Sequence, residues 1–80
     1  MTLYIKPTCP YCVHVMQTID VKRVPNLTVV EVPQSHGDRV ELKELTGQTY
    51  VPTLIDGETI IADDDDGIIA YLQPMVQMPA

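Results

Sequence analysis

Both cysteines of the chain lie in one short segment, Thr8-Cys9-Pro10-Tyr11-Cys12. The segment follows an apolar run, Leu3–Ile5, and opens a stretch with helical periodicity, so we expect it at a strand-to-helix junction. A Cys-x-x-Cys pair at such a junction is typical of redox chemistry, because two sulfurs on the first turn of a helix can close a disulfide. The unpaired N–H groups and the dipole at that end of a helix favour a thiolate. Pro10 fits the first helical position, where a missing N–H is tolerated.

The periodicity that follows distinguishes the two thiols. Apolar side chains recur with the spacing of one helix face at Cys12, Val15, Met16 and Ile19. Cys12 is therefore expected in the core, where it would act as the resolving thiol. Cys9 precedes this face, and we assign it as the exposed nucleophile.

Three other interpretations of the pair are weaker. A structural disulfide requires an oxidising compartment and usually closes a longer loop. Half of a zinc site would need two further ligands, unless two subunits share the ion. The candidates are His14 and His36, and we expect both at the surface rather than as ligands. A pair of inert core cysteines would not need the proline between them, so redox chemistry without a metal is the favoured interpretation.

The composition is that of a small acidic domain. The chain has 80 residues, 45% of them hydrophobic, and we expect one domain over residues 1–80. It contains no Trp or Phe, so aliphatic side chains must form the core. A net charge of −6 argues against nucleic acid or an anionic membrane as a partner. The first residues lack the features of a signal peptide and no apolar stretch is long enough to cross a membrane, so a cytoplasmic location is expected.

The pattern of apolar, β-branched and turn-forming residues predicts seven elements. Strands are expected at residues 2–6, 27–32, 51–55 and 59–62, with a tight turn at Asp56-Gly57. Helices are expected at residues 10–22, at 38–46, and from the acidic run 63–66 to just before Pro74, after which the tail should fray. The order β-α-β-α-β-β-α predicts an α/β fold, in which three helices flank a four-stranded mixed sheet. Cys9 then lies at the carboxyl end of a parallel strand, where sites gather.

Three further side chains could assist the cysteines: Lys6, Tyr11 and Arg39. Lys6 could stabilise the Cys9 thiolate, or it could be a solvated strand end. Arg39 could hold a carboxylate, or it could be an ordinary surface residue of the second helix. Tyr11 is expected to be exposed, with packing area and a hydroxyl to offer a bound thiol.

Val51 and Pro52 open the third predicted strand, a position where a proline is allowed. The sequence alone favours a trans bond between them, because cis X–Pro bonds make up only about 5–6% of such bonds in folded proteins. A cis bond would turn the N–H and C=O of Val51 outward. Those groups could then pair with an extended peptide.

These residues resemble the glutaredoxin family, whose members have the thioredoxin-like fold. Residues 5–12, Ile-Lys-Pro-Thr-Cys-Pro-Tyr-Cys, look like its active-site signature. Leu45-Thr46-Gly47 with Tyr50-Val51-Pro52 resembles the segment leading to its cis-proline, and Asp56-Gly57 with the acidic run resembles its last motif. The resemblance covers nearly the whole chain. It implies a glutathione-dependent oxidoreductase that reduces glutathione mixed disulfides and protein disulfides.

The resemblance also implies how glutathione, the co-substrate, would be bound. Lys6 and Arg39 would meet its glycyl carboxylate, and Tyr11 would flank its sulfur. The backbone of Val51, ahead of a cis Pro52, would pair with its cysteinyl unit.

The acidic run 63–66 is where the chain departs from the family pattern. The resemblance implies that the first turn of the third helix, at Asp64 and Asp65, holds the γ-glutamyl end of glutathione. The family's Gly-Gly pair is missing here, and Ile-Ala-Asp-Asp-Asp-Asp-Gly stands at residues 61–67. Four like charges should repel the ligand's carboxylates, so we predict weak binding that tightens in salt. Neutralising Asp63 and Asp66 should then lower the KM for glutathione.

The expected partners are glutathione, glutathionylated or disulfide-containing proteins and, indirectly, glutathione reductase, with the chain acting as a monomer. Two alternatives remain open. The chain could be an electron donor of the same family that thioredoxin reductase reduces. It could also be an iron–sulfur carrier in which Cys9 and external glutathione hold a cluster between two subunits, although Pro10 stiffens the turn and counts against this alternative.

Overall fold

The first strand of the chain, β1 (Thr2–Ile5), lies inside a four-stranded sheet. It pairs in parallel with β2 (Thr28–Glu31) and antiparallel with β3 (Thr53–Asp56). The chain then turns back at Gly57 into β4 (Thr59–Ala62), which pairs antiparallel with β3. The resulting order, β2-β1-β3-β4, is the mixed sheet that the sequence predicts.

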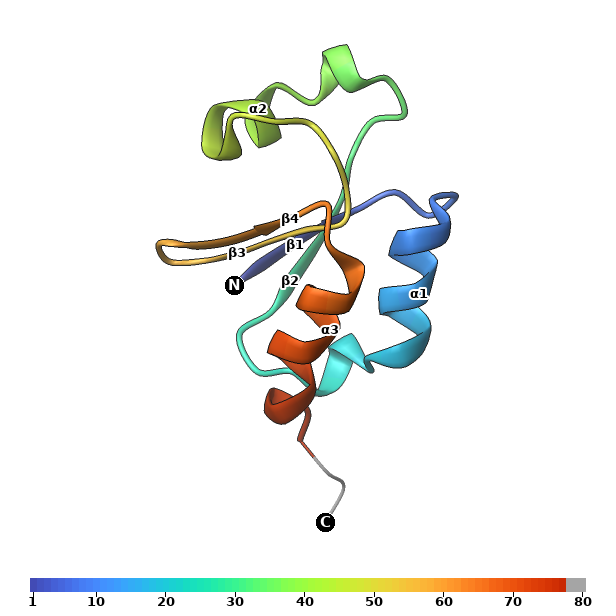
Figure 1. The fold of residues 1–80 in the computed structure, drawn as a ribbon, viewed down its shortest axis with the longest axis vertical. Coiled ribbons are helices and arrows are strands. Elements are labelled where there is room, and N and C mark those ends of the chain that lie inside the picture. The colour runs from blue at the N-terminus through green and yellow to red at the C-terminus, as the bar shows by residue number, and fades with distance from the viewer. Residues whose placement is uncertain (78–80) are drawn as a thin grey trace.

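Helices alternate with these strands, as shown in Figure 1, a computed structural model that describes residues 1–77. The helices are α1 (Pro10–Thr18), α2 (Val40–Thr46) and α3 (Asp65–Leu72). The order confirms the predicted α/β thioredoxin-like fold. Residues 78–80 lie outside the described part, so one domain over residues 1–80 stays a prediction. Among residues 1–77, no helix has the length and apolar character needed to cross a membrane.

Two helix ends differ from the prediction, and β3 begins at Thr53, so Val51 and Pro52 precede the strand instead of opening it. α1 ends at Thr18 rather than near residue 22, because Ile19 leaves the helix with φ −109° and ψ 124°. The Asp20 carboxylate then accepts a hydrogen bond of 3.2 Å from the Lys22 N–H and starts a separate 3₁₀ turn at 21–23. α2 begins at Val40 rather than at residue 38, because a 3₁₀ turn occupies residues 36–38.

The core lies between the sheet and the pair α1 and α3, which run side by side while α2 stands apart from them (Figure 1). The predicted stripe of α1 is buried, with Cys12 and Ile19 each 1% exposed and Met16 half-buried. α3 adds Ile68 and Leu72 to this core. On α2, Leu42 is buried. Leu45, which the sequence predicts on the same apolar edge, is exposed.

Both described ends of the chain are held against the segment that connects α1 with β2. The ammonium of Met1 donates to the Asn26 carbonyl at 2.9 Å, and the Gln77 N–H donates to the Arg23 carbonyl at 2.8 Å. A 3₁₀ turn covers residues 73–75. The prediction that the tail frays from Pro74 is therefore wrong for residues 74–77, and its remainder, 78–80, lies outside the described residues.

Candidate active site

Cys9 is the N-cap residue of α1 and follows the carboxyl end of β1. Its N–H donates to the Lys6 carbonyl at 3.0 Å, and its own carbonyl accepts from the Val13 N–H at 2.9 Å. No side chain of residues 1–77 caps this helix end, and Pro10 occupies the first turn as predicted. Cys9 is half-buried rather than exposed as predicted. Its sulfur therefore lies where the uncapped N–H groups and the dipole of α1 favour negative charge.

Cys12 lies one turn further along and is buried beneath Cys9, as its place on the apolar stripe predicts. Its sulfur accepts a hydrogen bond of 3.4 Å from the Lys6 N–H. Burial raises the pKa of the Cys12 thiol to about 11, while the Lys6 N–H and the charge of Arg39 act in the opposite direction and the neighbouring Cys9 raises it further. Cys12 is therefore a thiol at neutral pH, which suits a group that reacts second.

Val51 lies across from the thiol of Cys9, and the Cys9 sulfur is 3.9 Å from the Val51 carbonyl oxygen. The Val51–Pro52 bond is cis, as the resemblance implies and the sequence alone does not. The loop that carries this bond is fixed on both sides. The Thr53 hydroxyl donates to the Tyr50 carbonyl at 2.7 Å, and the Asp63 N–H donates to the Pro52 carbonyl at 3.0 Å.

An open groove of about 320 Å³ runs past the Cys9 sulfur. It brings together many of the predicted site residues, and its lining includes Lys6, Cys9, Tyr11, Arg39, Val51 and Asp63. Tyr11 is 61% exposed at its rim, as predicted. A larger hollow of about 560 Å³ lies next to the groove and shares His36 and Arg39 with it. We place the chemistry in the smaller groove, because that is where the reactive sulfur lies.

Arg39 has a different environment from the surface position that its place in the sequence suggests. It is 4% exposed, so the interpretation as an ordinary surface residue is wrong. Its guanidinium donates to the carbonyls of Pro33, Gln34 and Thr49 at 2.7, 3.1 and 2.9 Å. Those bonds tie the loop after β2 to the loop before β3. Binding of a ligand carboxylate by the remaining donors stays a prediction.

The acidic run has a different role at each position. Asp63 has a positive φ of 53° and lines the groove. Asp64 is the N-cap of α3, and its carboxylate accepts from the Gly67 N–H at 2.9 Å. Asp65 faces His14, which lowers the pKa of its carboxyl group through a hydrogen bond. Asp64 and Asp65 are thus engaged within the chain, and their predicted contacts with glutathione stay predictions.

Two histidines take part in contacts that local sequence patterns do not reveal. Nδ1 of His14 lies 2.6 Å from Oδ2 of Asp65, so the pair joins α1 to α3 across 51 residues of sequence. Nδ1 of His36 lies 2.9 Å from the Thr49 hydroxyl, and its ring packs edge-on against Tyr50 with centroids 5.6 Å apart. Each contact joins segments that are distant in the sequence, so no short-range signal marks it.

A family model and two known proteins match the chain. The family model described as Glutaredoxin matches residues 1–61. Two proteins named Glutaredoxin, from Neisseria meningitidis serogroup A (strain Z2491) and serogroup B (strain MC58), are each 30% identical to the chain over 66 residues. Each alignment covers 82% of this chain and 78% of the relative. No solved structure gives a significant match.

Proposed function

Since the chain belongs to the glutaredoxin family, a family of thiol–disulfide oxidoreductases, we propose that it uses glutathione to reduce glutathione mixed disulfides and protein disulfides in the cytoplasm. The observation that supports this proposal is the arrangement of the two thiols. The Cys9 sulfur lies beside an open groove at the N-terminus of α1, and Cys12 is buried behind it. Glutathione is the co-substrate of the proposed reaction, and the reaction needs no metal.

In the first step, the Cys9 thiolate attacks the glutathionyl sulfur of a mixed disulfide. The old S–S bond breaks, the target leaves as a thiolate and takes up a proton, and a Cys9–glutathione disulfide forms. A second glutathione, as its thiolate, then attacks the glutathionyl sulfur. Oxidised glutathione leaves and the Cys9 thiolate is restored, so the mixed disulfide and one free glutathione are converted overall to the target thiol and oxidised glutathione.

With a protein disulfide, Cys9 forms a mixed disulfide with the target and Cys12 completes the exchange. The Cys12 thiol gives up its proton and attacks the Cys9 sulfur, which releases the second target thiol and leaves a Cys9–Cys12 disulfide. Charge on Cys9 raises the pKa of Cys12 in the free protein. That contribution disappears once Cys9 is in a disulfide, so Cys12 becomes easier to deprotonate when its attack is needed.

The direct test is turnover of a small glutathione mixed disulfide with glutathione, glutathione reductase and NADPH. Cys9→Ser should abolish turnover, and Cys12→Ser should retain it, because reduction of a glutathione mixed disulfide needs only the first sulfur. Reduction of a protein disulfide should require both cysteines. Turnover by the Cys9→Ser variant at the parent rate would contradict the assignment.

A second reductant is worth testing, because Asp64 and Asp65 bond to Gly67 and His14, whereas the resemblance implies that they hold the γ-glutamyl end of glutathione. The same assay with thioredoxin reductase and NADPH, without glutathione, measures this alternative. Faster turnover with thioredoxin reductase than with glutathione would show that the same thiol chemistry takes its electrons from thioredoxin reductase.

A further inference from the structure

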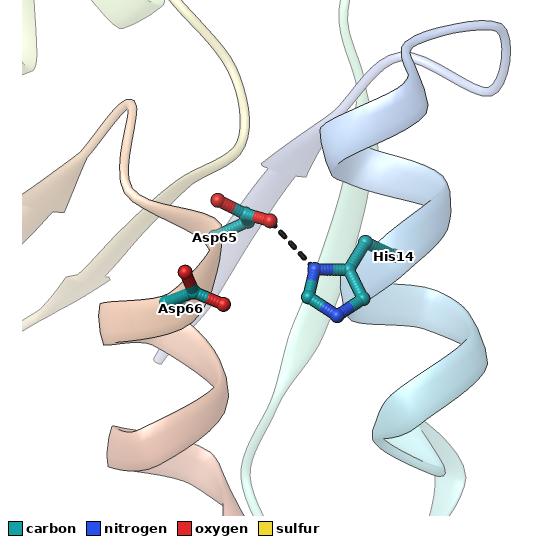
Figure 2. Close-up of side chains that lie close together, drawn as sticks. All are labelled: His14, Asp65 and Asp66. Atoms are coloured by element: carbon teal, nitrogen blue, oxygen red, sulfur yellow. Dashed lines mark hydrogen bonds and ion pairs between the residues drawn. The ribbon is translucent and has the colours of Figure 1, made fainter.

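His14 of α1 and the acidic residues Asp65 and Asp66 of α3 form a cluster between the two helices (Figure 2). One potential ligand atom from each residue lies within 4.8 Å of those of the other two. His14 and Asp66 are exposed and Asp65 is half-buried, so the cluster is open to solvent. We propose that these three side chains bind a divalent transition-metal ion of the zinc type, at a site separate from the cysteines.

The donor set suits such an ion. An imidazole nitrogen and carboxylate oxygens are established zinc ligands, and sites with three protein ligands leave a fourth position for water. Metal–ligand distances of about 2.0–2.2 Å place neighbouring ligand atoms roughly 3.3 Å apart in a tetrahedral site. The 2.6 Å separation between His14 Nδ1 and Asp65 Oδ2 would therefore widen slightly, and Asp66 would close in. Rotation of exposed side chains can supply both movements.

The surrounding charge also favours a cation. The chain carries a net charge of −6, and Asp63 and Asp64 immediately precede the two carboxylates of the cluster. The N-terminus of α3 opposes a cation, but with only about half an elementary charge. The carboxylates outweigh that contribution.

A plain ion pair is the competing explanation, and Asp66 distinguishes the two. An ion pair between His14 and Asp65 needs only those two side chains, and their hydrogen bond already satisfies it. Asp66 makes no ion pair among the described residues, yet it directs its carboxylate towards the same space between α1 and α3 (Figure 2). A metal ion would use Asp66 as a ligand, whereas the ion pair would not.

The test is calorimetric titration of the full chain with zinc chloride in a buffer that does not bind zinc. The chain is first oxidised to the Cys9–Cys12 disulfide, with its free thiol content checked, because thiolates would otherwise bind zinc themselves. We expect one zinc ion per chain. Asp66→Asn and His14→Gln should each weaken binding at least about tenfold, since even loss of an outer partner of a metal ligand costs about 10–100-fold.

Asp63→Asn is the matched control, because it removes the same charge from the same acidic run but lies outside the donor set. It should weaken zinc binding less than about threefold at physiological salt, because an exposed charge that does not ligate the ion acts on it only through screening solvent. Asparagine also tolerates the positive φ at this position. Zinc should raise the thermal midpoint of the parent and of Asp63→Asn, and raise that of Asp66→Asn much less.

Two results would overturn the proposal. One is no zinc binding by the oxidised chain, whether or not the reduced chain binds zinc, and the other is equal binding by the parent and Asp66→Asn. Thermal unfolding of each variant without zinc shows whether it is folded. If His14→Gln does not fold, Asp66→Asn alone decides, because Asp66 makes no ion pair within residues 1–77 whose loss could unfold the chain.

Discussion

Replacing Arg39 by alanine tests whether this residue holds the structure together or binds ligand. The side chain is 4% exposed and donates three hydrogen bonds to carbonyls of two loops. A hydrogen bond from a charged group contributes about 1.5–3 kcal/mol. Pro33 and Gln34 are exposed, so water can replace the arginine at their carbonyls, and the bond to half-buried Thr49 should account for most of the loss.

We therefore expect Arg39→Ala to lower the free energy of unfolding by about 2–4 kcal/mol. That is a large part of the total, because a domain of this length has about 4–12 kcal/mol of stability. The thermal midpoint should fall by more than about 10 °C. Arg39→Lys should lower the free energy of unfolding by a smaller amount, because lysine keeps the charge. It should still lower it, because lysine has no planar group that reaches three carbonyls.

Urea unfolding followed by far-ultraviolet circular dichroism measures these changes, since the chain has no tryptophan. Lys43→Ala is the control, because it removes an exposed cation from α2, the helix that Arg39 precedes, and should change stability by less than about 0.5 kcal/mol. The KM for glutathione is measured in the same variants. A stable Arg39→Ala variant with a greatly raised KM would refute the structural role and favour the predicted carboxylate contact.

Three further predictions concern Gly67, Cys12 and Asp63. Gly67→Ala should destabilise the parent, because the added Cβ would collide with the Asp64 carboxylate, but should stabilise an Asp64→Ala background by up to about 1 kcal/mol through helix propensity. Urea unfolding of the four proteins tests this, and a change in the free energy of unfolding with the same sign in both backgrounds would contradict it. The rate of Cys12 alkylation in the reduced chain, followed by mass spectrometry, should rise about tenfold per pH unit from pH 7 to 10, because the pKa of its thiol is raised to about 11. A rate that levels off near pH 8.5 would show an ordinary thiol. Asp63→Asn should lower the KM for glutathione, and the difference should shrink at high salt as the charge is screened, whereas a raised KM would show that Asp63 attracts the ligand.

The sequence predicts the parts of this fold that depend on local patterns. The stripe on α1 predicts the burial of Cys12, and the same pattern separates the two thiols. Asp56-Gly57 predicts the turn between β3 and β4, where Gly57 has a positive φ of 59°. In each case the signal lies within a few residues of the feature, which is why periodicity and turn chemistry find it.

The environments of Arg39 and His14 could not be predicted in this way. Arg39 binds carbonyls in two loops that have no periodicity, and a cation at a helix start is ordinarily solvated. His14 meets Asp65 only because α1 and α3 pack side by side. The cis bond before Pro52 is a similar case, since the sequence alone favours trans and only the resemblance to a family implies cis.

The way both described ends of the chain are held has a practical consequence. Met1 and Gln77 are fixed to Asn26 and Arg23, in the segment after α1, whereas Cys9 lies at the opposite end of that helix. A linker joined before Met1 would turn the ammonium into an amide, which still carries an N–H for the Asn26 carbonyl. Tethered to a bead or an electrode through that linker, the molecule would present its groove to solvent and its attachment point to the support.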